Sequence, residues 1–384
     1  MKKLLIILGL MLVIFAVYVT FFSPSTLPIS PLGSVLPSLE HKNTGKMDYV
    51  IFGFAPYWNL KKLTPESLNN ITHFAYFHLL LNGDGSIYTK VNKKSEDPGY
   101  TNYKRLNAGT ISYDSKPLII TFMPESQTAL ASSIGSSLSR QRTISTIKNV
   151  LAESGAMGVN IDYEPVVDIS QGVRDNFTLF IKELRSSLAS TNSKQLTISI
   201  YASTGSRPRL WDLTALSNLV DYFVVMSYDY TMPGSSTAGP NAPLRGSGNL
   251  FEHDIIKNIA ELTKSVPSTK LLLGIPFYGY EWDTVDSSKY APVESKGSTA
   301  SFERIQKMLD DKTLELVWDR NTLTPYGIAT GSGQTSQIYF ENETSLRLKM
   351  DFVKSASLGG IAIWALGYEG NNSWVWPIIN QLNQ

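Results

Sequence analysis

Two carboxylates, Asp162 and Glu164, lie two residues apart in the stretch GVNIDYEP at residues 158–165. Alternate side chains of an extended strand share a face, so both carboxyls would point the same way as Asn160. Burying a carboxylate is unfavourable unless it has a partner. A negatively charged neighbour raises the pKa of a second carboxyl toward neutrality. Such a pair is typical of general acid catalysis. The alternative is a solvent-facing acidic turn, which three alternating polar residues in an apolar stretch argue against.

Other kinds of site chemistry are poorly represented in this chain. It has no cysteine, which excludes disulfides, thiolate catalysis and zinc–thiolate sites. Four histidines (His41, His73, His78 and His253) form no metal-binding pair at helical spacing, so we predict neither a metal nor another cofactor. A net charge of +1 without long runs of one sign predicts no nucleic-acid partner. The 19 Tyr, 16 Phe and 7 Trp favour a core or a surface that stacks on sugar rings.

The elements that must position the carboxylates alternate between strand and helix patterns. Eight short β-branched or aromatic stretches predict strands, at residues 49–58, 71–79, 117–124, 158–164, 195–202, 220–230, 270–280 and 359–367. Between them, residues 140–154 and 173–190 carry apolar residues at helical spacing. Near-continuous apolar strands separated by helices predict a parallel sheet, and eight of them predict an α/β fold, the closed (β/α)8 TIM barrel. A doubly wound sheet is the alternative, but no G-x-G-x-x-G follows the first strand.

In such a barrel, Glu164 would end the fourth strand at the face where barrel enzymes keep their catalytic residues. The gap between the seventh and eighth strands, residues 281–342, is too long for one helix. It holds a helix pattern at 301–311 and strand patterns at 314–319 and 336–341. The Gly-rich TGSGQTS at 330–336 lacks the Lys of a phosphate-binding loop and is interpreted as a turn. We therefore predict a small α+β insertion that deepens a cleft at the catalytic face.

The N-terminus predicts a membrane anchor. Lys2 and Lys3 precede the apolar run 4–22, which is long enough to cross a bilayer. No A-x-A cleavage pattern follows, so residues 1–22 are interpreted as an uncleaved signal-anchor with the remainder on the extracellular side. Residues 23–47, rich in Pro, Ser and Gly, would be a linker to the catalytic body at 48–384. Secretion after cleavage, or a buried core helix, are the alternatives.

The acidic stretch also carries a family resemblance. MGVNIDYE at 157–164 resembles the D-G-x-D-x-D-x-E signature of glycoside hydrolase family 18, the chitinase-like family. Three further stretches resemble that family's strand-end motifs in the right order: VVMSYDY at 224–230, LGIPFYGYEW at 273–282 and GGIAIWALGYEG at 359–370. The resemblance covers residues 48–370 and implies a retaining hydrolysis in which the substrate's own acetamido oxygen attacks, so that no protein nucleophile is needed.

The resemblance implies a role for each matching residue. Glu164 would be the general acid and then the base, and Asp162 would orient the 2-acetamido group and steady an oxazolinium intermediate. Tyr228 would donate a hydrogen bond to the acetamido carbonyl. The implied substrate contacts are Asn160, Met226, Asp229, Trp364 as the floor under the sugar, and Tyr57 and Trp58 at the end of the first strand.

Three positions depart from the family pattern. Met157 and Asn160 stand where the signature has Asp, and Tyr280 stands where many members carry Arg. Asn160 is expected to donate a hydrogen bond to Asp162, although an amide cannot relay a proton. Because the acid and the orienting carboxylate are both present, we expect activity to survive these departures.

The leading hypothesis is hydrolysis of a β-1,4-linked N-acetylglucosamine polysaccharide, with chitin and peptidoglycan both open as substrates. The alternative from another class is a non-catalytic, lectin-like protein that binds chitin or peptidoglycan on the same barrel; such relatives usually lose the acid, whereas Glu164 is present. A metal-dependent deacetylase would need a His ligand cluster that the sequence lacks. The expected partners are the polysaccharide and, through the N-terminal helix, a membrane, and a monomer is the default state.

Overall fold

The computed structural model describes residues 48–384 except residues 193, 249–250 and 332. The predicted anchor (1–22) and linker (23–47) lie outside the described residues. Among the helices that the structure does describe, none combines the length and the apolar character needed to span a bilayer.

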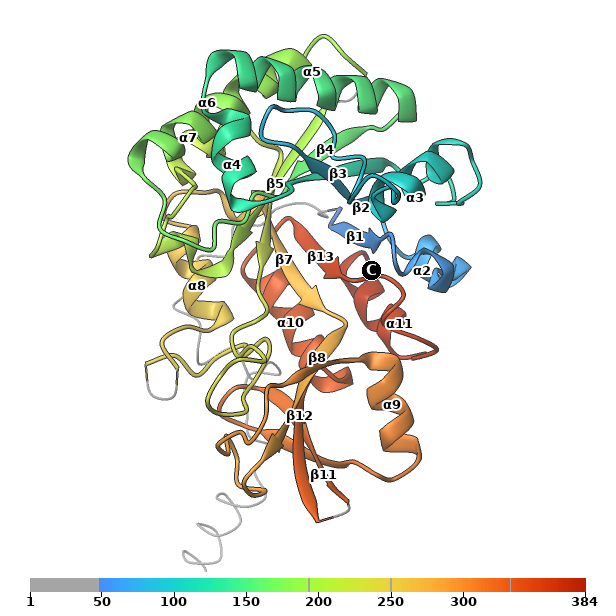
Figure 1. Cartoon of the computed structure of the whole chain (residues 1–384). Helices are drawn as coiled ribbons and strands as arrows, with labels where there is room; N and C mark the ends of the chain where they lie inside the picture. Colours follow the sequence, from blue (N-terminus) through green and yellow to red (C-terminus); the bar gives the residue numbers. More distant parts are fainter. Residues whose placement is uncertain (1–47, 193, 249–250, 332) are drawn as a thin grey trace, which may run out of the picture. The chain divides into compact units, whose positions relative to one another are not determined.

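Eight parallel strands close into a barrel, as the sequence predicted (Figure 1). They are β1 (Val50–Pro56), β2 (His73–Leu81), β3 (Leu118–Pro124), β4 (Gly158–Ile161), β5 (Gln195–Tyr201), β6 (Tyr222–Met226), β7 (Leu271–Pro276) and β13 (Gly360–Trp364). Around the barrel the order is β1-β13-β7-β6-β5-β4-β3-β2. Four strands end three or four residues before their predicted ends: β4 ends at Ile161, β6 at Met226 and β13 at Trp364, and the predicted strand 270–280 divides at Phe277 into β7 and a strand of the insertion. The catalytic stretches therefore lie just past the ends of their strands.

Helices follow most strands and cover the outside of the barrel. They are α2 (Pro65–Asn69), α3 (Pro98–Asn107), α4 (Gln127–Ile134), α5 (Ser137–Ser154), α6 (Gln171–Leu188), α7 (Leu213–Ser217), α8 (Ile255–Leu262), α10 (Glu343–Ser355) and α11 (Val375–Ile379). Short 3-10 turns occupy Leu60–Lys62, Ala202–Gly205, Ser268–Lys270 and Asn380–Leu382. The helix before the catalytic strand, α5, starts with a capping box at Ser136 and stops at Gly155, whose φ of 64° is easy only for glycine. Because α5 ends at Gly155, the chain can enter β4 three residues later, at Gly158.

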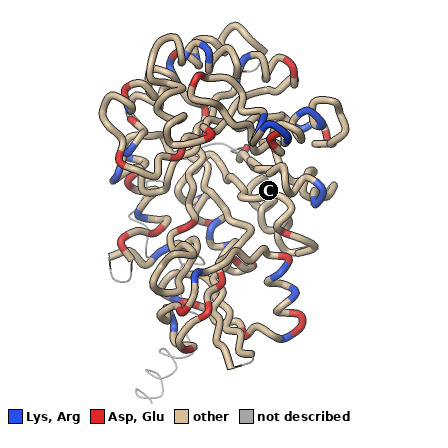
Figure 2. Tube along the Cα trace, in the orientation of Figure 1, with Lys and Arg blue, Asp and Glu red and all other residues tan. Residues whose placement is uncertain are grey.

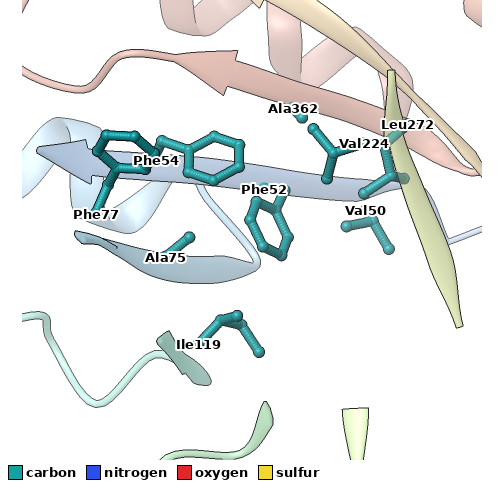
Figure 3. Packing of buried hydrophobic residues seen from close by; sticks show 9 residues of the cluster. All are labelled: Val50, Phe52, Phe54, Ala75, Phe77, Ile119, Val224, Leu272 and Ala362. Atoms are coloured by element: carbon teal, nitrogen blue, oxygen red, sulfur yellow. The ribbon is translucent and has the colours of Figure 1, made fainter. Parts of the chain in front are cut away.

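The barrel interior is filled by apolar side chains from both ends of the strands. Figure 3 shows the cluster formed by Val50, Phe52, Phe54, Ala75, Phe77, Ile119, Val224, Leu272 and Ala362. Phe54 on β1 and Phe77 on β2 pack against Trp364, which lies at the C-terminal end of β13. The upper part of this core therefore supports the C-terminal face of the barrel. The barrel is thus a packed plug and not a pore.

The chain between β7 and β13 forms a second, antiparallel sheet (Figure 1). Its strands are β8 (Tyr278–Thr284), β9 (Ser298–Ser301), β10 (Glu315–Asp319), β11 (Thr324–Gly331) and β12 (Gln334–Tyr339), in the order β10-β11-β12-β8-β9. Helix α9 (Phe302–Asp310) packs on it through a cluster that contains Ile305, Leu314 and Ile338. Because β8 follows β7 after one residue, the sheet rises directly from the catalytic end of the barrel.

Candidate active site

A cavity of about 240 Å³ opens at the C-terminal ends of the barrel strands. Six predicted site residues line it: Asp162, Glu164, Met226, Tyr228, Asp229 and Trp364. They come from β4, β6 and β13, which are far apart in sequence. Seven further lining residues are Phe54, Phe77, Ser199, Tyr278, Tyr280, Thr299 and Tyr368, of which Tyr278, Tyr280 and Thr299 belong to the insertion. The insertion therefore supplies one wall of the cavity.

The main chain at Glu164 is fixed by hydrogen bonds from one side chain. The side chain of Gln127, at the start of α4, donates to the Glu164 carbonyl oxygen (2.9 Å) and accepts from the Val166 amide (3.0 Å). Burial raises the pKa of Glu164 to about 7, the negative charge of Asp229 adds to the rise, and the Tyr201 hydroxyl opposes it. A carboxyl with this pKa is protonated below neutral pH and can still release its proton, which is what a general acid/base requires.

Asp162 is buried beside it, with 4% of its surface exposed. Burial and then the charge of Glu164 raise its pKa, while the nearby Ser199 hydroxyl lowers it. Its Oδ1 has no hydrogen-bond partner among the described residues. A buried acceptor without a partner is unfavourable, so this oxygen is available to a donor that a ligand brings.

Asn160 does not make the expected hydrogen bond to Asp162. Its amide donates to the Ser199 hydroxyl (3.0 Å), and its carbonyl oxygen accepts from Thr197 (2.9 Å). Asn160 is completely buried and is absent from the residues that line the cavity, so the expected direct substrate contact is corrected to a supporting position beneath Asp162. Met157 is 38% exposed at the other end of β4, also outside the cavity lining.

Asp229 is fixed by hydroxyl groups and not by a cation. Tyr278 and Tyr280 both donate to its Oδ1, the second at 2.8 Å. Its backbone is left-handed (φ 62°), a conformation that Asp tolerates, and its amide donates to the buried Asn241 (2.8 Å). Burial raises the pKa of Asp229, and the two tyrosine hydroxyls lower it. Tyr280 thus offers this carboxylate a neutral hydroxyl, and within the described part of the chain no Lys or Arg forms an ion pair with Asp229.

Tyr228 and Trp364 complete the centre of the cavity. Burial and the three neighbouring carboxylates raise the pKa of Tyr228 well above its ordinary value, so its hydroxyl remains a hydrogen-bond donor. The Trp364 ring lies 4.5 Å from Phe77 and 5.7 Å from Phe54, centroid to centroid, with the rings steeply inclined. Trp364 thus presents an indole surface supported from below by the barrel core.

Tyr57 and Trp58 lie outside the cavity. Both line a neighbouring groove of about 800 Å³ that runs between the chain after β1 and α3. Trp58 is 46% exposed, its indole N–H donates to the Tyr368 hydroxyl (3.2 Å), and its ring lies 6.4 Å from Trp364. Trp58 therefore connects the groove to the cavity wall instead of contributing to the cavity itself.

Several residues of the site were not predicted from the sequence. Ser199 and Thr197 carried a usable signal, because they alternate as polar residues in an otherwise apolar strand, as Asn160 and Asp162 do. Tyr278 lies in a stretch that was singled out only for Tyr280. Gln127 bonds the main chain of Glu164, 37 positions away, and Asn241 bonds the main chain of Asp229, 12 positions away. No local sequence pattern marks either residue.

A closed barrel with a raised carboxyl at the end of β4, a second carboxyl beside it and an aromatic floor defines a glycoside-hydrolase class of site. The sequence model described as glycosyl hydrolases family 18 matches residues 16–369. The chain belongs to this family.

The individual relatives share between about a fifth and a little over a quarter of their aligned residues with this chain. The chain is 27% identical over 240 residues to di-N-acetylchitobiase of Rattus norvegicus, covering 56% of this chain and 62% of that protein. It is 22% identical over 314 residues to the cortical fragment-lytic enzyme of Bacillus anthracis, covering 79% and 66%. A solved chitinase of Cycas revoluta in complex with (GlcNAc)4 shares the fold with a TM-score of 0.75 and 20% identity, over 87% of this chain and 99% of that one. Curated relatives are matched over 51% to 67% of their own lengths.

Proposed function

We propose that the chain hydrolyses β-1,4-linked N-acetylglucosamine polysaccharide with retention of configuration, through attack by the substrate's own acetamido oxygen. The observation that carries the proposal is the pairing of Glu164, whose pKa is about 7, with Asp162, whose buried Oδ1 lacks a protein partner. One carboxyl is suited to proton transfer and the other to holding an acetamido N–H.

The reaction would proceed in two steps. Glu164 protonates the glycosidic oxygen while the acetamido carbonyl oxygen attacks the anomeric carbon, which breaks the glycosidic bond and forms an oxazolinium ion. Asp162 accepts a hydrogen bond from the acetamido N–H and stabilises the positive charge of the oxazolinium ion. Tyr228 donates a hydrogen bond to the acetamido oxygen and aligns it. Glu164, now a carboxylate, then takes a proton from the water that opens the ring. The acid is thereby restored.

The floor of the cavity fits this substrate. Apolar faces of sugar rings pack on aromatic side chains, and Trp364, which lines the cavity and packs against Phe77, presents such a face. The relatives named for chitobiase and cortical fragment-lytic activity support N-acetylglucosamine polymers in general, and both chitin and bacterial cell-wall glycan belong to that class.

The test is release of reducing ends by the purified chain from chitooligosaccharides and from purified peptidoglycan, with Glu164→Gln as the control. Turnover that disappears in the variant is expected. Saturable binding of both polymers without turnover would overturn the proposal in favour of a lectin-like protein.

We also propose that residues 1–22 hold the catalytic body on the extracellular side of a membrane. The support is the apolar run 4–22 behind Lys2 and Lys3. Fractionation of cells that express the full chain, followed by N-terminal sequencing, tests this: a membrane-bound protein that retains Met1 is expected, and a soluble protein that starts after residue 22 would contradict it.

A further inference from the structure

The groove beside the cavity differs from it in charge. Lys61 and Arg105 line the groove together with one carboxylate, Asp114. Residues 57–116, which contribute all of its lining, contain eight Lys and Arg against five Asp and Glu, whereas residues 117–384 contain 22 against 26. Figure 2 shows Lys and Arg gathered around α2 and α3.

The two cations of the groove have no carboxylate partner within the described part of the chain. Each has a sequence neighbour that does: Lys62 pairs with Glu303 (2.9 Å) and Lys104 pairs with Glu96 (2.7 Å). Arg105 instead donates to the Asn102 side chain (3.1 Å), which orients its guanidinium while leaving its remaining N–H groups available. Lys61 and Arg105 are therefore suited to bind a ligand that brings its own carboxylates.

The groove adjoins the cavity at Trp58. Trp364 and Tyr368 line the cavity, Trp58 lines the groove, and Trp58 contacts both through a ring separation of 6.4 Å and a hydrogen bond of 3.2 Å. A sugar that extends from the cavity over Trp58 would therefore place any branch it carries at the mouth of the groove.

We propose that the groove binds short peptide branches carried by the glycan, with Lys61 and Arg105 on their carboxylates and Asp114 on a free ammonium group. This inference rests on the proposed function and selects peptide-bearing glycan, the chemistry of peptidoglycan, over chitin. An unbranched chitin chain has no charged group to contact these three side chains. The volume of about 800 Å³ is large enough for a peptide of several residues.

The test compares three substrates: peptide-bearing glycan strands, the same strands after an amidase has removed the peptides, and a chitooligosaccharide. With the full chain, KM for the peptide-bearing strands is expected to be about tenfold lower than for the stripped strands, since two exposed ion pairs contribute about this much. The double variant K61A/R105A removes that difference, and its loss is confined to the peptide-bearing strands. High salt reduces the wild-type preference, because exposed charge pairs are screened.

The matched control is K104A, which removes a neighbouring cation that is paired with Glu96 and lies outside the groove lining. It should keep the wild-type preference. Equal KM for intact and stripped strands in the wild type, or an equal loss of preference in K104A, would overturn the proposal. If no substrate is turned over, the proposed function fails separately, and titration of a peptide-bearing disaccharide into the wild type and K61A/R105A still tests the groove: equal affinities would refute it.

Discussion

The cavity and the groove lie on either side of Trp58 and use charge in opposite ways. Three carboxylates line the cavity (Asp162, Glu164 and Asp229), with no Lys or Arg among the described residues that line it. The groove has two cations and one carboxylate, all on exposed side chains. The same 384-residue chain thus places buried charge of one sign next to exposed charge of mixed sign.

The difference teaches what burial adds to a charged group. In the cavity, desolvation is the largest cause of the raised pKa of each carboxyl, and it brings the pKa of Glu164 to about 7. In the groove, exposure leaves the charges hydrated, so each contact there contributes little by itself and is weakened by salt. Chemistry is expected from the first region and recognition from the second.

The largest effect should come from removing the acid. Glu164→Gln keeps the shape of the side chain but cannot donate the proton, so kcat should fall by about 10²–10⁴-fold. Steady-state kinetics on a chitooligosaccharide measure this. The matched control is Glu369→Gln, because burial also raises the pKa of Glu369 to about 7 although this residue does not line the cavity. A comparable loss in both variants would show that a raised pKa, and not the position in the cavity, was being tested.

The second effect separates the orienting carboxylate from the acid. Asp162→Asn removes the negative charge that steadies the oxazolinium ion, and kcat should fall by about 10²-fold or more with little change in KM. Substrates whose leaving group needs no protonation provide the contrast: they should partly rescue Glu164→Gln but not Asp162→Asn. Rescue of both variants would mean that Asp162 has no separate role.

The barrel and the centre of the cavity were predictable from sequence because they follow short periods. Alternation along β4 placed Asp162 and Glu164 on one side, and eight apolar strands predicted closure. The exact strand ends were not predictable: the alternation of polar and apolar residues continues through Glu164, although the strand pairing stops at Ile161.

The rest of the site depends on contacts between distant segments. Asn160 was expected to bond Asp162, yet its partners are Thr197, which lies opposite it on β5, and Ser199 two residues further along that strand. Only the register of β4 against β5 decides this pairing. Trp58 was expected to contact the substrate, but it lies outside the cavity lining, where its indole N–H donates to the hydroxyl of Tyr368, 310 residues later in the sequence. The groove could not be foreseen, since neither Lys61 nor Arg105 belongs to a local motif.

The third prediction concerns pH. The charge of Asp229 raises the pKa of Glu164, so the neutral Asp229→Asn should lower that pKa from about 7 toward, but not to, its ordinary value, since burial remains the larger cause. Because Glu164 must be protonated to act, the alkaline limb of kcat/KM should move to lower pH by about one unit, with roughly tenfold less activity at pH 8. Tyr280→Phe is the comparison: it keeps the Asp229 carboxyl and the Tyr278 hydroxyl that donates to it, and removes one hydroxyl, so the limb should move less than in Asp229→Asn. A limb that stays near 7 in Asp229→Asn would remove the electrostatic link between these two carboxyls.

The smallest effect should come from Trp58, where the two regions meet. Trp58→Ala removes an exposed ring that reaches Trp364 only at 6.4 Å, so KM for long oligosaccharides should rise about three- to tenfold while kcat on a disaccharide substrate stays unchanged. Trp58→Phe should retain much of the stacking surface and lie between the two. The disaccharide is the short substrate of the comparison and is expected to report on the cavity without the groove. An equal fall of kcat on short and long substrates would mean that Trp58 supports the cavity floor directly, and the cavity and the groove would then have to be treated as one site.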